Sequence, residues 1–246
     1  MCLNDRPLLT KAHIIPDWMY FGLFDSKHKI AMVDLGQKLP DKRKSSGVYN
    51  ADILCATCDN EILGSLENYG KKVLCGTDSV MLKDIFQSKD IRKGFGLNSA
   101  KIFAEDYVSF KLFLVSLLWK MHICQDDFFK DVNLGQKHAE VIRKSLLNHL
   151  KLNEDEYESC ILAVQNSKLI LKMISMPRKI KQTHNTYYVM LLNGLVFMFN
   201  LSPVNKMDLI TKSRLREDGT MSIPLLKDNS AEMFLSSITG VSVQYK

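Results

Sequence analysis

Apolar residues recur at helical spacing in the middle of the chain. Over Glu105–Ile123 they fall three or four positions apart, and Asp106 suits the positive end of a helix dipole. We therefore predict a helix here, with Lys111 and Lys120 on its solvent side. Because its apolar residues lie on more than one side of the axis, we expect this helix to pack both against a C-terminal hairpin around Asn193-Gly194 and against either the N-terminal region or a second subunit.

The last third of the chain changes to alternating apolar residues rich in β-branched and aromatic types. Leu169–Met176 is predicted to be a strand that Pro177 ends. Tyr187–Leu192 and Leu195–Leu201 flank Asn193-Gly194, a dipeptide that tolerates the positive φ angles of a type I′ turn. We therefore predict a β-hairpin at this point.

Further helices are predicted over Gln136–Leu150, Glu154–Val164 and Asn229–Ile238. Before about residue 100 the apolar runs are short and broken by Gly, Pro, Asn and Asp. We therefore expect an α+β protein of two regions, residues 1–100 and residues 101–246, the second helical and then antiparallel β.

The composition allows a packed core and excludes several classes of protein. Of 246 residues, 46% are hydrophobic and 24% charged, which excludes a disordered tail, a collagen-like repeat and a disulfide-dense toxin. The net charge of +6 favours a polyanionic partner only mildly. The most apolar run, Phe110–Trp119, is too short to cross a bilayer, and Met1–Pro7 lacks a signal-peptide pattern. We expect a cytoplasmic protein without a membrane partner, whose cysteines are thiols or metal ligands.

Two segments carry chemical signals. In the first, Leu9–Pro16, His13 lies within a short apolar run that Pro16 ends, so rigid backbone holds its imidazole. The second, Asn50–Glu61, runs as a strand into Cys55-x-x-Cys58, whose sulfurs can bind one zinc ion from a tight turn. A helix is expected after it, over Asn60–Tyr69.

Together these segments resemble the HNH endonuclease family, whose ββα-metal fold carries a catalytic His on its first strand in an A-H-I-x-P context. The string Ala12-His13-Ile14-Ile15-Pro16 is intact. Asn50 precedes Cys55 as in the N-x-x-L-L-C pattern, and Asp59 follows Cys58 where the family usually has His. The resemblance spans about residues 1–72. It implies a Mg²⁺- or Mn²⁺-dependent nuclease that cleaves DNA, of a kind that in bacteria often serves restriction or phage defence.

The resemblance implies roles for these residues. His13 would be the general base and Asn50 would position its loop, while Asp59 would hold the catalytic ion. Glu67 either binds that ion or orients a neighbouring ligand. A structural zinc would use Cys55, Cys58, Cys2 and, as the fourth ligand, Cys75 or a His.

The chain departs from the family pattern at three points. Ala12 stands where many members have a metal ligand, and the segment between His13 and Asn50 is long, which suggests an inserted loop. Cys2 would be the second cysteine of an upstream C-x-x-C pair, whose first position falls before Met1.

Plainer interpretations of each residue stay open. His13 could be a buried core histidine, Cys55 and Cys58 could be buried thiols, and Asp59 could cap the following helix. The corresponding alternative functions are a catalytically inactive, zinc-stapled nucleic-acid-binding module and a subunit that binds a protein partner or a second copy through residues 101–246.

A basic run in the long loop offers phosphate contacts, because the loop connects the two motif segments. The residues that we predict to bind nucleic acid are Lys38, Lys42, Arg43 and Lys44.

Overall fold

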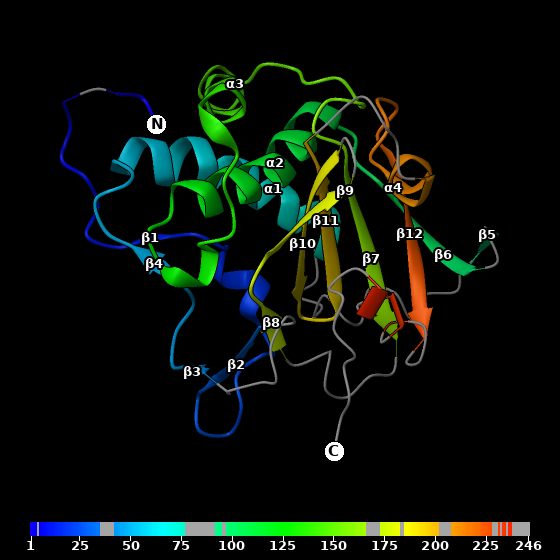
Figure 1. The fold of residues 1–246 in the computed structure, drawn as a ribbon. Coiled ribbons are helices and arrows are strands. Elements are labelled where there is room, and N and C mark those ends of the chain that lie inside the picture. The colour runs from blue at the N-terminus through cyan, green and yellow to red at the C-terminus, as the bar shows by residue number, and fades with distance from the viewer. Residues whose placement is uncertain are drawn as a thin grey trace.

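The computed structural model describes residues 1–3, 5–34, 42–76, 92–94, 97–165, 173–182, 185–201 and 208–227, together with residues 231, 233, 234, 236 and 237. The protein is α+β, as predicted: a large sheet is covered by helices, and a small two-stranded sheet lies at one side (Figure 1). Among the described residues, no helix is long and apolar enough to cross a membrane.

The large sheet is mostly antiparallel, with parallel pairing where β12 meets β7 and where β2 meets β8. In spatial order its strands are β3 (Lys42–Lys44), β2 (Ile30–Val33), β8 (Met173–Ser175), β10 (Asn185–Leu192), β11 (Leu195–Asn200), β7 (Ser159–Gln165), β12 (Thr220–Lys227), β6 (Leu97–Phe103) and β5 (Arg92–Gly94), while β9 (Arg178–Gln182) also pairs with β10.

The predicted hairpin forms the centre of this sheet. Leu192 pairs with Leu195, which leaves Asn193 and Gly194 as a two-residue turn with φ angles of 52° and 77°. Both positive angles are those that a type I′ turn requires. Every residue of β11 is buried, as is nearly all of β10, so both faces of the hairpin are covered.

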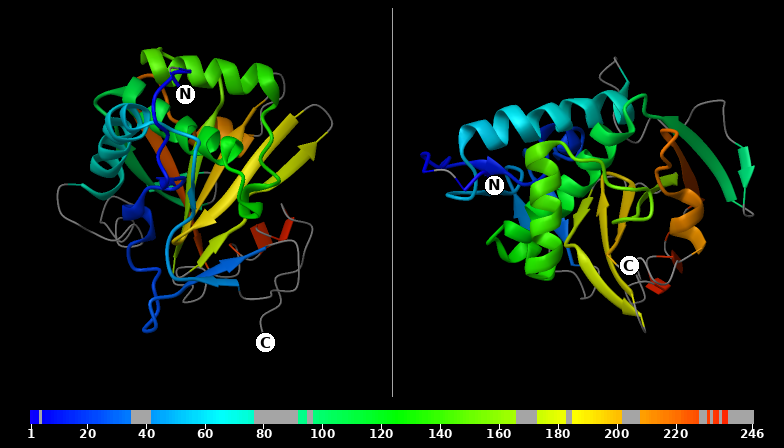
Figure 2. Two further views of the ribbon diagram at one scale, coloured as in Figure 1. Left: turned by 90° about the vertical axis from the view of Figure 1, so that its left-hand side faces the viewer. Right: turned by 90° about the horizontal axis from the view of Figure 1, so that it is seen from above.

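Helices cover the sheet from two sides. Helices α1 (Gly64–Cys75), α2 (Tyr107–Ile123) and α3 (Gly135–Asn148) lie on one side, and α4 (Asp208–Ser213) lies on the other (Figure 2, right). Helix α2 packs against α1 of the N-terminal region, as predicted, and also against α3 and β7, the strand next to the predicted hairpin. Short 3₁₀ turns, η1 (Asp17–Tyr20) and η4 (Asp127–Phe129), lie among the connections.

The N-terminus of α2 lies where it was predicted, at Asp106, but α2 has no solvent side at Lys111 and Lys120. The Asp106 side chain accepts a hydrogen bond from the Ser109 backbone N–H, which caps the helix. Every residue from Ser109 to Met121 is buried, and the exposed fractions of Lys111 and Lys120 are 1% and 0%. The prediction for these two lysines was therefore wrong, because neighbours surround the helix on all sides.

The prediction of a helix over Glu154–Val164 was wrong. Residues 159–165 form β7, between β11 and β12 in the sheet. A short apolar run buried on both faces fits either element, and here pairing with neighbouring strands decides the outcome. Of the predicted helix Asn229–Ile238, the described residues Ala231, Met233, Phe234, Ser236 and Ser237 are helical.

The N-terminal part forms a ββα unit joined to the rest of the core. Strands β1 (Ala12–His13) and β4 (Tyr49–Asn50) pair antiparallel, and the chain then enters a π-helix, η2 (Thr57–Leu63), that continues into α1. The boundary predicted at residue 100 falls inside β6, and β2 joins the large sheet beside β8. Both parts of the chain therefore contribute to one sheet and one hydrophobic core.

Candidate functional site

His13 stands on β1 with its side chain turned toward the helix that follows β4. Its neighbour Ala12 is fully buried, and successive side chains of a strand point to opposite faces, so the imidazole points away from the core behind Ala12. The strand is fixed by pairing with β4 and by a 3.1 Å hydrogen bond from the Ile14 N–H to the Val48 carbonyl. The side chain of His13 is 26% exposed, so solvent reaches part of the ring.

Two buried carboxylates from the helix meet His13. Glu67 Oε2 lies 2.9 Å from His13 Nε2, and Asp59 Oδ2 lies 3.9 Å from His13 Nδ1. Asp59 and Glu67 are 3% and 6% exposed. All three residues are candidates from their sequence motifs, and the fold brings them together.

The π-helix explains how two residues eight positions apart reach one imidazole. In a regular α-helix, Asp59 and Glu67 would be offset by about 80° around the axis. In η2 the Gly64 N–H bonds to the Asp59 carbonyl five residues before it, which widens the turn. The wider turn reduces the angle per residue and so brings the two carboxylates toward the same side.

Lys120, predicted to lie in solvent, completes the site from α2. Its Nζ donates to Glu67 Oε1 at 2.5 Å and to the His13 carbonyl oxygen at 3.3 Å. The side chain is fully buried. The signal that could have found it is the apolar character of α2 on every side, which leaves any lysine within it enclosed.

The pKa values in this cluster follow from burial and charge. The hydrogen bond to Glu67 raises the pKa of His13 above 6.5, although burial opposes the shift. Burial acts to raise the pKa of Glu67, but His13 and Lys120 together hold it below its usual value. Burial raises the pKa of Asp59, with the charges of His13 and Lys120 opposing.

The two carboxylates differ in their capacity for a divalent cation. Among the residues that the structure describes, none gives a hydrogen bond to the buried Asp59 Oδ1, so this oxygen can accept a cation or a water molecule. Both oxygens of Glu67 are already engaged, by His13 and by Lys120. Asp59 is therefore the carboxylate of this pair with an oxygen left to accept a further partner, and Glu67 fits the orienting role that the sequence left open rather than that of a metal ligand.

Asn50 connects β4 to the segment that follows α2. Its Nδ2 donates to the Ala51 carbonyl at 2.9 Å, and its Oδ1 accepts from the Gln125 N–H at 2.5 Å. Its backbone pairs with Ala12, next to His13. Asn50 thus holds the strand opposite His13 in place, consistent with a positioning role.

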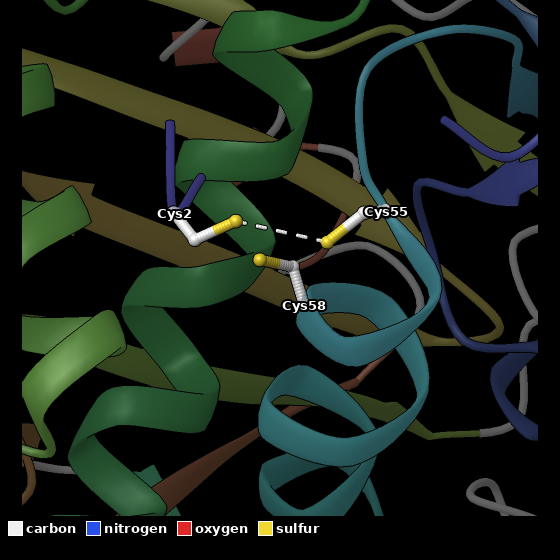
Figure 3. Close-up of side chains that lie close together, drawn as sticks. All are labelled: Cys2, Cys55 and Cys58. Carbon is white, nitrogen blue, oxygen red and sulfur yellow. Dashed lines mark hydrogen bonds between the residues drawn. The ribbon is translucent and has the colours of Figure 1, made fainter. Parts of the chain in front are cut away.

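Three thiols form a separate cluster beside this centre. The sulfur atoms of Cys2, Cys55 and Cys58 all lie within 4.8 Å of one another, and those of Cys2 and Cys55 are 3.7 Å apart (Figure 3). Tetrahedral zinc with bonds of about 2.3 Å separates its sulfur ligands by about 3.8 Å. The three thiols could therefore hold a metal ion.

Contacts from two other segments hold Cys2 in this cluster. Arg143 of α3 donates from Nη1 to the Met1 carbonyl at 2.6 Å, and Arg6 donates from Nη1 to Thr57 Oγ1 at 2.8 Å. Burial and the neighbouring thiols raise the pKa of Cys58 to about 12. Without a cation this thiol is protonated at neutral pH, so a metal ion would have to displace its proton.

The prediction of Cys75 as the fourth zinc ligand was wrong, because Cys75 lies far from the three thiols. It is the last residue of α1, and Cys58 lies 17 residues earlier in the same continuous helical segment. At 1.5 Å per residue this corresponds to about 25 Å. Within the described part of the chain, no fourth His, Cys, Asp or Glu joins the three thiols.

The predicted phosphate contacts are only partly visible. Lys44 ends the edge strand β3, and its Nζ pairs with Asp126 Oδ2 at 2.8 Å, so its charge is already partnered. Lys42 and Arg43 belong to the same strand, but their side chains lie outside the described atoms, and Lys38 lies outside the described residues.

Comparisons with protein-family models, curated proteins and solved structures find no match to this chain.

Proposed function

We propose that this protein is a metal-dependent endonuclease of the HNH type that hydrolyses phosphodiester bonds in DNA. The observation that carries the proposal is the placement of His13 on a two-stranded antiparallel unit, facing Asp59 on the helix that follows. This is the arrangement that the ββα-metal resemblance implies. The thiol cluster supports the proposal as a second feature at the expected place, where zinc would staple the N-terminal segment to the start of the helix.

The chemistry assigns one task to each side chain. His13 takes a proton from a water molecule whose oxygen attacks phosphorus, the bond from phosphorus to the leaving oxygen breaks, and solvent protonates that oxygen. Asp59 would hold Mg²⁺ or Mn²⁺, and the ion would stabilise negative charge on the phosphate and on the leaving oxygen. Asn50 holds β4, and through it β1, in place.

Nicking of supercoiled plasmid by the full-length protein, with and without Mg²⁺ or Mn²⁺, tests the proposal. His13→Ala should lower the nicking rate at least about 100-fold, the lower end of what a positioned general base supplies. Asp59→Asn should raise the metal concentration that half-maximal nicking requires. Lys144→Met, on the exposed face of α3, serves as a matched surface control. Undiminished nicking by His13→Ala would refute the assignment.

A second candidate is a catalytically inactive module that binds nucleic acid. Two observations favour it: the position before His13 is the buried Ala12, and Lys120 and His13 engage both oxygens of Glu67. The site then offers one carboxylate for a catalytic cation. DNA binding by fluorescence anisotropy without any nicking, in either metal, would favour this function over the nuclease.

A further inference from the structure

We propose that Glu67 and Lys120 are positioning residues that fix His13 with its hydrogen on Nε2, so that Nδ1 is the nitrogen that accepts the proton of water. The catalytic part of this statement rests on the proposed nuclease function. The part that concerns the position of the hydrogen can be measured without any substrate. The proposal is carried by the chain of contacts from Lys120 through Glu67 to His13.

His13 is the donor in its contact with Glu67. An ionised carboxylate has only acceptor sites, so the 2.9 Å contact between Glu67 Oε2 and His13 Nε2 requires the hydrogen on Nε2. In a neutral imidazole the other nitrogen then carries a lone pair. Nδ1 is therefore the nitrogen that can accept a proton.

Glu67 stays ionised in its buried position because Lys120 lies beside it. A carboxylate out of water needs a partner charge, and Lys120 Nζ supplies it at 2.5 Å from Glu67 Oε1. Lys120 has no exposed surface, and Glu67 has little. The pair is therefore shielded from solvent and held in one geometry by the packing of α2 against α1.

Nδ1 of His13 points toward Asp59. It lies 3.9 Å from Asp59 Oδ2, which is too long for a direct hydrogen bond. On this side Asp59 Oδ1 also has no hydrogen-bond partner among the described atoms, and the ring is partly exposed. Nδ1 thus faces the carboxylate that we propose for the cation, where an attacking water would stand.

Lys120 also fixes the backbone that carries the imidazole. Its Nζ donates to the His13 carbonyl oxygen at 3.3 Å, while the same ammonium holds Glu67. One side chain therefore sets both the position of β1 and the partner of the ring. This double contact distinguishes Lys120 from Lys111, which lies on the opposite face of α2 and donates to the Tyr157 carbonyl at 3.2 Å.

The test is the ¹⁵N spectrum of the His13 imidazole in the full-length protein, recorded at alkaline pH, where the ring is neutral. We expect wild-type protein to show a protonated Nε2 and an unprotonated Nδ1. In Glu67→Gln, Lys120 retains the amide oxygen and leaves the amide NH₂ facing Nε2, so the hydrogen should move to Nδ1. In the double variant Glu67→Gln with Lys120→Met, the amide can turn either way, and the preference should disappear.

Lys111→Met is the matched control and should leave the His13 spectrum unchanged. A wild-type ring that carries its hydrogen on Nδ1 would overturn the proposal, and so would an unchanged tautomer in a folded Glu67→Gln protein. Because the wild-type measurement needs no variant, a folding defect in either variant leaves the proposal testable.

Kinetics of plasmid nicking give the second readout. Glu67→Gln should lower kcat about 10- to 100-fold, as expected for a residue that orients a reacting group, while KM for DNA stays within about twofold. A raised KM with unchanged kcat would contradict the positioning role. Confirmed tautomers in a protein that never nicks DNA would refute the nuclease proposal alone, so the two failures are distinguishable.

Discussion

Lys111 and Lys120 stand nine residues apart on α2, about 180° around the helix axis, and both ammonium groups are enclosed by protein. Lys120 faces His13 and Glu67, whereas Lys111 faces the Tyr157 carbonyl and the carboxylate of Glu158. Arg214 also pairs with Glu158, so that carboxylate keeps a partner if Lys111 is removed. Glu67 has no second lysine or arginine among its described contacts.

This difference predicts opposite effects of the same substitution. Lys120→Met should destabilise the protein by about 3 kcal/mol or more, because it leaves a buried carboxylate without its cation. Lys111→Met should be neutral or stabilise the protein by up to about 2 kcal/mol, because it removes a desolvated charge and keeps the packing volume. Urea denaturation of both variants measures the two changes in the free energy of unfolding. Equal destabilisation by the two substitutions would contradict the predicted difference between Lys111 and Lys120.

The stability difference between wild type and Lys111→Met should depend on pH. Burial lowers the pKa of Lys111 from 10.5 to about 7, so between these values the unfolded chain binds more protons than the folded one. The free energy of unfolding of wild type then rises with pH relative to the variant. The advantage of Lys111→Met should be largest below about pH 7 and should shrink toward pH 10.5. Urea denaturation of wild type and Lys111→Met across this pH window measures the difference in their free energies of unfolding. A difference that stays constant with pH would argue against the lowered pKa of Lys111.

The thiol cluster predicts bound zinc that depends on Cys2, Cys55 and Cys58. Purified protein should contain about one zinc per chain, and the double variant Cys55→Ser with Cys58→Ser should lose the metal and unfold the N-terminal region, because metal binding contributes to folding. Cys75→Ser is the matched control and should keep its zinc, since Cys75 lies at the far end of α1. Elemental analysis measures the zinc content, and circular dichroism measures the folding of each protein. Folded wild-type protein without zinc would identify plain buried thiols.

The close approach of α1 to α2 predicts a steric penalty at Gly70. A Cβ atom there would lie 2.5 Å from carbon atoms of the Phe113 ring. Gly70→Ala should therefore cost about 1–3 kcal/mol, despite the gain in helix propensity. At Gly64 the nearest atom is the Asp59 carbonyl oxygen at 3.4 Å, so Gly64→Ala should be close to neutral or stabilising. Equal urea midpoints for the two variants would mean that α2 does not lie so close to α1.

A fragment of residues 1–100 should be poorly soluble and inactive. It lacks α2, which supplies Lys120 and covers α1, and it lacks β8, the neighbour of β2 in the large sheet. Exposed apolar faces and an unpaired strand edge both favour aggregation. Solubility, zinc content and nicking of the fragment are the measurements. A soluble, zinc-containing, active fragment would show that the remaining residues are an appended module.

The sequence by itself determined the elements whose signals are local. Asn193-Gly194 specifies its turn, because few residues other than asparagine and glycine readily adopt the positive φ angles found there. The periodicity of α2 and its cap at Asp106 are likewise contained within a few turns of chain. The Ala12–Pro16 and Cys55–Cys58 strings identified His13 and two of the three clustered thiols for the same reason.

Only the tertiary structure decided which distant residues meet. Lys120 lies 53 positions from Glu67 and 107 from His13, and no local pattern places an ammonium between them. The segment that forms β7 fits a helix as well as a strand until β11 and β12 pair with it. The burial of a charged side chain depends on what surrounds its helix. Cys75 is excluded from the thiol cluster because the rise of the helix separates its two ends. These outcomes follow from packing between segments, which hydrophobic periodicity along the chain does not encode.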